Sequence, residues 1–254
     1  MKDDHDPALY AWFLEVMGLL VAGCFLFFNF HLIVSSSTII LLIALGIVEA
    51  ISMYVYMKQH AFNSLSISAI ISRTRLVWTA LFAFLFLGEQ LSSMSYIGIF
   101  ILFLGLSVGT APHKIMVDRG MKYSYLSAVM ISVSNNLFKS ASSVASVPVI
   151  VTAMALPTVI VYPFILKNSR QRIKLFFKTK LLSKVLAALA NVSALFFFLW
   201  AVRTGPVSLV NAIYQGTMIF AILAGILFLG EKTDVARKLI GAAIAMIGVF
   251  ALTL

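Results

Sequence analysis

The chain has 254 residues, of which 61% are hydrophobic and only 11% are charged, a composition far from that of a soluble domain. Its net charge of +10 would suit a nucleic-acid ligand, but seven of the 19 Lys and Arg residues lie in one loop, residues 167–184. Such clusters are typical of cytoplasmic loops beside anionic lipid headgroups. The single cysteine, Cys24, excludes an internal disulfide and a cysteine metal cluster. We therefore expect a protein of the lipid bilayer without a nucleic-acid partner.

Nine apolar segments follow one another along the chain. A helix needs about 20 apolar residues to cross the hydrocarbon layer, and these continuous runs lack the alternation of barrel strands. The pattern predicts an all-α integral membrane protein, and the distribution of Lys and Arg between the loops places the N-terminus inside. The segments cover residues 8–29, 37–57, 63–87, 94–111, 122–143, 147–166, 182–202, 206–229 and 236–254.

Four charged side chains lie within the first three segments, and Arg73 of the third points away from that segment's polar stripe. The other three are the candidates. Glu15 is in the first segment, Glu49 is near the middle of the second, and Arg75 is in the middle of the third. At mid-depth each such group costs roughly 2.5–3.5 kcal/mol on insertion scales, which makes each a functional candidate by default. The alternative for Glu49 and Arg75 is a structural ion pair that joins two helices without binding any ligand.

Polar side chains recur in the later segments. Asn135 and Lys139 lie on a polar face of the fifth segment, and Asn191 lies in the seventh. Asn211 and Gln215 lie in the eighth. Amide side chains within membrane spans form hydrogen bonds either to a solute or to a neighbouring helix. Lys139 is near enough to the end of its helix to extend to the membrane–water interface, which favours a structural role for it. The four histidines are too scattered along the chain for a metal site.

The phrase LFLGE occurs at residues 85–89 and again, 142 residues later, at residues 227–231. This offset pairs segments one to four with segments six to nine and leaves segment five without a partner. The pairing predicts a five-helix unit present twice, with the first helix of the first copy missing. Because five is odd, the second copy is inverted, as is typical of secondary transporters. Glycine ends a helix and glutamate begins the next turn, so structural roles are expected for Gly88, Glu89, Gly230 and Glu231.

The stretches FLFLGEQLSSMSYIGIFILFLGLSVG (84–109) and ILFLGEKTDVARKLIGAAIAMIGVFAL (226–252) resemble the closing helix pair of the EamA repeat of the drug/metabolite transporter superfamily. The resemblance covers essentially the whole chain and implies two domains, residues 1–112 with four helices and residues 113–254 with five. Members of this superfamily usually have ten helices in two inverted repeats. Two explanations for the missing helix are open: a start codon assigned too late, or a natural nine-helix variant. The N-terminal sequence MKDDHDP resembles a loop between helices, which favours the first.

The resemblance implies transport of a small molecule. We expect a secondary active transporter of small polar metabolites, such as amino acids, that works by alternating access in a bacterial or archaeal plasma membrane. In this scheme Arg75 would hold an anionic group of the solute and Glu49 would carry a coupling proton. Further hydrogen bonds to the solute would come from Asn191, Asn211 and Gln215.

Other functions stay open on the sequence alone. Glu15, with Trp12 and Tyr10 nearby in the sequence, would suit proton-coupled efflux of cationic drugs. The missing helix would suit a non-transporting membrane subunit or an inactive remnant. An enzyme is not expected, because the chain lacks HExxH, GxSxG and phosphate-loop motifs, and nothing indicates a cofactor. The expected partners are an unidentified solute and the lipid bilayer, with a homodimer as one oligomeric option.

Overall fold

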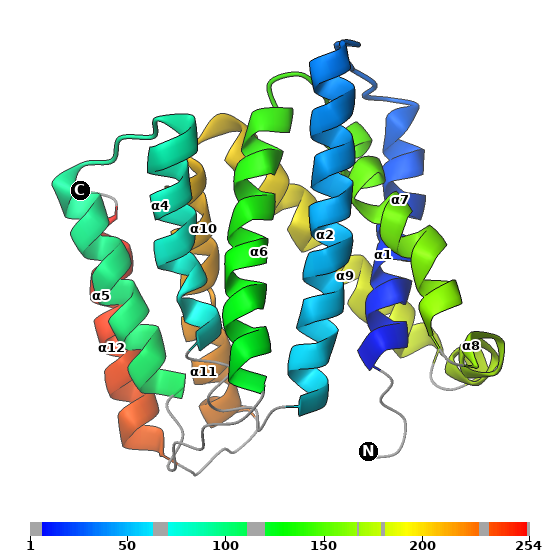
Figure 1. Cartoon of the computed structure of the whole chain (residues 1–254). Helices are drawn as coiled ribbons and strands as arrows, with labels where there is room; N and C mark the ends of the chain where they lie inside the picture. The colour runs from blue at the N-terminus through cyan, green and yellow to red at the C-terminus, as the bar shows by residue number, and fades with distance from the viewer. Residues whose placement is uncertain are drawn as a thin grey trace. The chain divides into compact units, whose positions relative to one another are not determined.

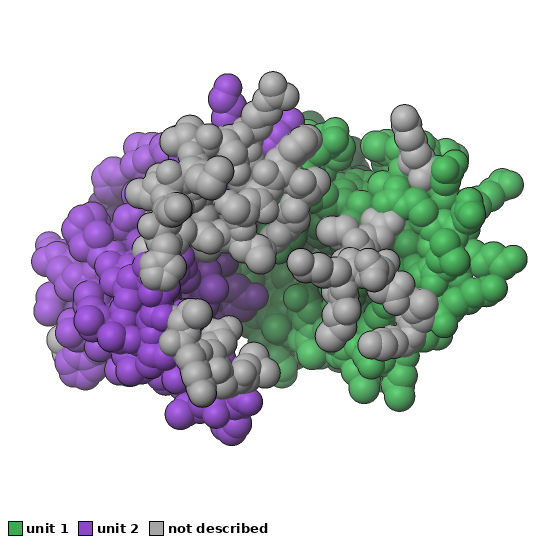
Figure 2. All heavy atoms as spheres, turned by 90° about the horizontal axis from the view of Figure 1, so that it is seen from below, with its two compact units in different colours: residues 1–61, 137–203 green, residues 62–136, 204–254 purple. Residues whose placement is uncertain are grey.

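A computed structural model describes residues 7–62, 71–110, 120–166, 168–178, 181–228 and 234–252. Within these residues every named element is a helix, and Leu32 and Ala145 form an isolated antiparallel bridge (Figure 1). The chain divides into two compact units, which Figure 2 distinguishes. Unit 1 comprises residues 1–61 and 137–203, and unit 2 comprises residues 62–136 and 204–254. The expected all-α class is therefore confirmed for the described part of the chain.

Unit 1 contains an antiparallel helix pair, α1 (Pro7–Leu26) and α7 (Val147–Ile165). Trp12 donates its indole N–H to the carbonyl of Val159 at 3.1 Å, and farther along α1 Gly18 faces Val151. Residue numbers therefore rise along α1 as they fall along α7. These two helices correspond to segments one and six, which the LFLGE offset pairs as equivalents.

α2 (Ser36–Phe62) approaches α7 at backbone distance. A Cβ added at Gly46 would lie 2.5 Å from the carbonyl oxygen of Ala153 and 3.0 Å from the ring of Pro157, so only glycine fits at this crossing. One turn later the Tyr162 hydroxyl donates to the carbonyl of Ala50 at 3.2 Å. The contact fixes the part of α2 that carries Glu49.

α8 (Ser169–Lys178) is a short helix within the basic loop, and it is followed by α9 (Leu181–Thr204). Phe176 is buried against Phe13 of α1, with ring centroids 5.3 Å apart, and the Lys184 ammonium lies 3.9 Å from the centroid of the same ring. Arg170, Lys174 and Lys178 are exposed. Figure 1 shows α8 nearly end-on, so α8 runs across the direction of α1.

Unit 2 centres on a close crossing of α5 and α12. A Cβ added at Gly98 would lie 2.9 Å from the carbonyl oxygen of Gly248, and one added at Gly105 would lie 2.8 Å from that of Gly241. The two contacts are reciprocal, because an offset of 143 residues, one more than that of the LFLGE phrase, carries Gly98 onto Gly241 and Gly105 onto Gly248. The helices of this unit are α4 (Arg75–Leu87), α5 (Ser93–Thr110), the first part of α6 (Gly120–Ala141), α10 (Val207–Gly216), α11 (Met218–Leu227) and α12 (Val235–Ala251).

The described helices differ in two ways from the nine expected segments. Segment eight is divided into α10 and α11 at Thr217, and α8 occupies a loop that was expected to lack structure of its own. Among the described residues, six stretches are long and apolar enough to cross a membrane, so the expected count of nine is not confirmed. These stretches are residues 8–26, 36–59, 93–110, 147–165, 181–204 and 207–227.

Candidate functional site

Two helix breaks hold equivalent places in the two halves of the sequence. Residues 71–73 are helical and a turn at Thr74 precedes α4, while Thr217 separates α10 from α11. Each threonine hydroxyl donates to the carbonyl three residues earlier, Ile71 or Tyr214, at 2.6 Å. Such side-chain bonds compete with the helical ladder, and short irregular turns within helices often mark functional hinges.

Arg73 lies one residue before the first break and Gln215 lies two residues before the second, and the two side chains contact each other. Arg73 Nη1 donates to Gln215 Oε1 at 2.8 Å, and Nη2 donates to the sulfur of Met218. Arg73 is 8% exposed and Gln215 is 2% exposed. The two residues are 142 positions apart, which is the LFLGE offset. Equivalent residues from the two halves therefore meet directly in the interior of unit 2.

Three buried N–H groups around this contact have no hydrogen-bond acceptor among the described residues. They are Nε of Arg73, Nε2 of Gln215 and Nδ2 of Asn211. Asn211 is 2% exposed and lies four residues before Gln215, so the two amides share one face of α10. Leaving a buried donor unpaired costs about 1–3 kcal/mol. Donors grouped in this way are typical of a ligand site.

The α4–α6 interface supports the same region from the other side of α4. Ser132 Oγ donates to the carbonyl of Arg75 at 3.1 Å and accepts a bond from the Thr79 hydroxyl at 3.1 Å. Asn136 Nδ2 donates to the carbonyls of Thr79 and Ser132, at 3.4 and 2.8 Å. These bonds fix the beginning of α4 against α6 within unit 2.

The first LFLGE phrase supplies a cap to α10. Gly88 adopts the left-handed conformation with φ of 65° and ends α4, which glycine does at little cost. The carboxylate of Glu89 then accepts bonds from the N–H of Val207 at 2.6 Å and from the N–H and hydroxyl of Ser208 at 3.2 and 2.6 Å. A carboxylate at a helix N-terminus also interacts favourably with the helix dipole. Glu89 therefore holds the helix that carries Asn211 and Gln215.

A second polar group lies in unit 1. Glu15 on α1 and Glu49 on α2 are close enough to interact electrostatically, and both interact with Tyr162 on α7. Tyr162 is bonded to the carbonyl of Ala50, which follows Glu49. Three helices thus bring two acidic side chains and a tyrosine to one place in this unit.

The remaining sequence candidates lie in several places. Arg75 belongs to unit 2 and Glu49 to unit 1, so their expected pairing stays a prediction. Asn191 is exposed on α9, and Asn135 is partly exposed on α6. Lys139 Nζ donates to the carbonyls of Val202 and Arg203 at the end of α9, at 2.8 and 3.3 Å. Gly230 and Glu231 lie outside the described residues.

Arg73 was not among the candidates from sequence, and the reason is specific. A regular helix through residues 68–79 places Arg75, not Arg73, on the polar stripe of that segment. At Thr74 the N–H bonds to the carbonyl three residues earlier, Ile71, at 3.0 Å, so the helix departs from regular α geometry there and the stripe of a regular helix shifts. The repeat offset contained the missing signal, because 142 residues carry Arg73 onto Gln215.

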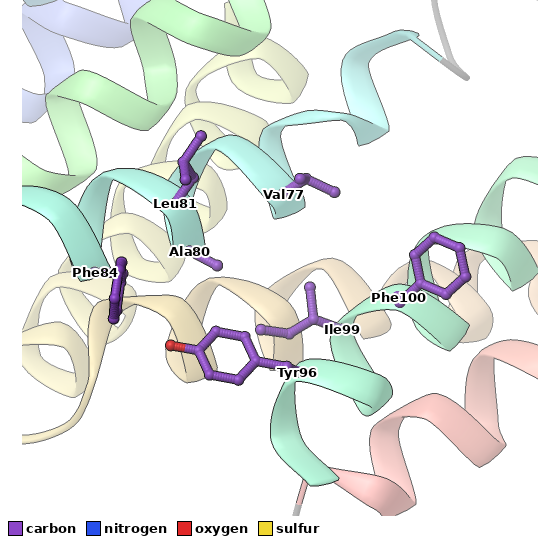
Figure 3. A pocket seen from close by; sticks show the side chains of 7 residues that line it. All are labelled: Val77, Ala80, Leu81, Phe84, Tyr96, Ile99 and Phe100. Carbon is purple, nitrogen blue, oxygen red and sulfur yellow. The ribbon is translucent and has the colours of Figure 1, made fainter. Parts of the chain in front are cut away.

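An apolar groove of about 480 Å³ runs between α4 and α5 (Figure 3). Its lining comes from Val77, Ala80, Leu81 and Phe84 of α4 and from Tyr96, Ile99 and Phe100 of α5. The tyrosine hydroxyl is the one polar side-chain group in its lining, so the groove does not suit a polar solute. It therefore differs in chemistry from the Arg73 region.

Both halves of the chain match one known protein family. The sequence model of the EamA-like transporter family matches residues 2–110 and again residues 118–254. No curated protein matches the chain. A solved structure described as "Crystal structure of protein" superposes with a TM-score of 0.75, at 16% identity, over 99% of this chain and 90% of that one. At this identity the likeness concerns the fold alone.

Proposed function

Because the chain belongs to the EamA-like transporter family, in the drug/metabolite transporter superfamily, we propose that it is a secondary active transporter of small polar solutes. Family membership and the apolar helices make it a multi-pass integral membrane protein. The proposed mechanism is alternating access, in which a site between two repeats opens to each side of the membrane in turn. The basic loops are compatible with a bacterial or archaeal plasma membrane.

The observation that carries this proposal is the antiparallel course of equivalent helices. α1 runs antiparallel to α7, and α5 runs antiparallel to α12. α4 runs antiparallel to α10, since Arg73 contacts Gln215 and Glu89 contacts Val207. A two-fold axis in the membrane plane produces this arrangement from two inverted copies of one unit. The geometry thus supports inverted repeats and the transport mechanism that accompanies them.

The proposed solute site is the group formed by Arg73, Asn211 and Gln215. Substrates of transporters with inverted repeats bind where the repeats meet, often beside interrupted helices. Arg73 and Gln215 are equivalent residues in direct contact, and each lies within two residues of an interruption. The unpaired donors there supply hydrogen bonds that a polar solute would accept.

The acidic group of unit 1 is the proposed coupling site. Glu15 and Glu49 repel each other when both are charged, and a proton bound by either one relieves this repulsion. The same group favours a second candidate function, the efflux of cations. Trp12 and Tyr10 lie three and five residues before Glu15 on α1, and aromatic rings beside a carboxylate attract organic cations.

Transport by the reconstituted protein tests the proposal without a prior choice of substrate. Proteoliposomes would be loaded with a small-molecule extract of cells, placed under a pH gradient, and sampled on both sides by mass spectrometry. We expect a restricted set of polar solutes to cross only when the protein is present. A set dominated by lipophilic cations and lost with Glu15→Gln would favour efflux instead. If no solute crosses in a protein-dependent way under either gradient direction, the transporter proposal is wrong.

A further inference from the structure

Arg73 lies in the interior of unit 2 without a matching acid among the described residues of that unit. The described acidic residues of this unit are Glu89 and Asp234. Glu89 is bonded to the start of α10, and Asp234 pairs with Arg237 at 2.9 Å. Arg73, nine-tenths buried, is bonded to an amide and a thioether, both neutral. A buried charge is expensive unless an opposite charge accompanies it.

Arg75 adds a second positive charge near Arg73. Arg75 lies close enough to Arg73 for the two positive charges to repel each other. Two like charges two residues apart disfavour each other, and the cost is greater for Arg73 because it is buried. A bound anion would offset the repulsion, whereas a bound cation would increase it.

The unpaired groups around Arg73 are all hydrogen-bond donors. Nε of Arg73, Nε2 of Gln215 and Nδ2 of Asn211 are N–H groups, and none of them can accept a hydrogen bond. A ligand that satisfies them must present several acceptor lone pairs at one point. A carboxylate or a phosphate does so, and bonds from a guanidinium to either group are among the stronger hydrogen bonds in proteins.

The two helix breaks also favour a bound anion. α4 begins at Arg75 and α11 begins at Met218, so both start directly beside the Arg73–Gln215 contact. Neither helix has an acidic residue in its first turn. A helix N-terminus carries a partial positive charge and favours anions. The two helix ends are equivalent in the repeat, and both lie next to the same unpaired donors.

We infer that Arg73, Gln215 and Asn211 form a site for one oxyanionic group, a carboxylate or a phosphate, on the transported solute. The inference rests on the proposed function and specifies its substrate class. In this structure Gln215 Oε1 holds the guanidinium. The anion replaces this bond with its own and leaves the whole amide free to turn its N–H toward the ligand. Because Arg73 and Gln215 are equivalent, the site belongs to both repeats alike.

The proteoliposome experiment tests the inference when it is repeated with variants. We expect the solutes moved by the unaltered protein to carry a carboxylate or a phosphate. Arg73→Gln should lower their rate roughly tenfold or more, because a buried charge partner is lost, and Arg73→Lys should retain part of the rate. Arg237→Gln is the matched control, since this arginine pairs with Asp234 at 2.9 Å in the same unit.

Binding to the purified protein in detergent separates the two anion sources. Sodium phosphate, sodium succinate and choline chloride would be compared at equal ionic strength by the shift of the thermal unfolding midpoint. Stabilisation by phosphate or by succinate that disappears in Arg73→Gln supports the inference and identifies the group. Stabilisation by neither salt, or transport of neutral or cationic solutes that Arg73→Gln leaves unchanged, overturns it. The second result would leave the transporter proposal intact, whereas a complete absence of transport would defeat that proposal itself.

Discussion

At the scale of single residues, Glu89 connects the repeated phrase to the proposed site. The left-handed Gly88 turns the chain out of α4, and the N–H of Glu89 bonds back to the carbonyl of Ala83 at 3.1 Å. The side chain is thereby directed to the beginning of α10, where it accepts bonds from Val207 and Ser208. The glutamate of a turn in one repeat thus fixes the start of a helix in the other.

Removing the Glu89 carboxylate should destabilise the protein. Glu89→Ala leaves two N–H groups at the start of α10 without acceptors, and we expect a loss of about 2 kcal/mol. The thermal unfolding midpoint of the detergent-purified protein would measure it. Glu89→Gln retains one acceptor oxygen and should lie between the alanine variant and the unaltered protein. An unchanged midpoint in Glu89→Ala would contradict the capping role.

Only part of the proposed site could be recognised from the sequence. The sequence names Asn211 and Gln215 as candidates, because two amides four residues apart on an apolar helix share one face, and their role in binding stays a prediction. Arg73 was not among the candidates, because a regular helix was assumed through Thr74, whose N–H bonds to the carbonyl three residues earlier, Ile71, at 3.0 Å. The carboxylate contacts of Glu89 were also missed, since nothing local relates residues 118 and 119 positions apart.

At the scale of elements, glycine decides how closely α5 and α12 approach. A Cβ added at Gly105 would lie 2.3 Å from the backbone nitrogen of Ala245, a distance that requires the helices to separate. We expect Gly105→Ala to lower stability by about 1–3 kcal/mol, as overpacking of a tight interface does. The thermal midpoint in detergent would again be the measurement.

Gly23→Ala is the matched control for the helix crossing. Gly23 lies in α1, and no heavy atom lies within 4 Å of a Cβ added there. Since alanine is favoured over glycine within a helix by about 1 kcal/mol, this variant should be as stable as the unaltered protein or more so. Equal midpoints for the two glycine variants would show that α5 and α12 do not pack at backbone distance.

Element boundaries were predictable where apolar runs meet polar turns, and less so elsewhere. The expected segment 94–111 corresponds to α5, Ser93–Thr110, because its polar flanks are unambiguous. α8 was not predicted, since its basic residues dominate the composition of the loop. Its apolar side chains acquire a role only when Phe176 meets Phe13 of α1. The break at Thr217 was hidden because apolar residues continue on both sides of it.

At the scale of the whole molecule, the compact units do not coincide with the sequence repeats. Unit 2 combines α4 and α5 from the first repeat with α10, α11 and α12 from the second, and unit 1 combines α1 and α2 with α7 and α9. The repeat was visible in the sequence because the LFLGE phrase and the glycines recur at a nearly fixed offset. Which helices pack together was not visible, because the contacts join equivalent positions far apart in the chain.

Because each compact unit combines helices from both repeats, we expect the two halves of the chain to depend on each other. Residues 1–112 contain α5 without α12, and residues 113–254 contain α12 without α5. Each half therefore lacks the helix that fills its glycine face, together with one member of the Arg73–Gln215 and Glu89–Val207 contacts. Helices in a bilayer associate through such close packing of small residues. We expect neither half to be stable alone and the two to assemble when they are co-expressed.

Co-purification from membranes with a tag on one half would measure this assembly. Gly105→Leu in the first half should reduce recovery of the second half, because the added side chain blocks the crossing with Ala245. Gly23→Leu, at a glycine with open space around its Cβ, should leave recovery unchanged. If residues 113–254 alone were monodisperse, with the unfolding midpoint of the full chain, the second repeat would be an independent domain. The packing of equivalent helices would then be a consequence of folding and not a condition for it.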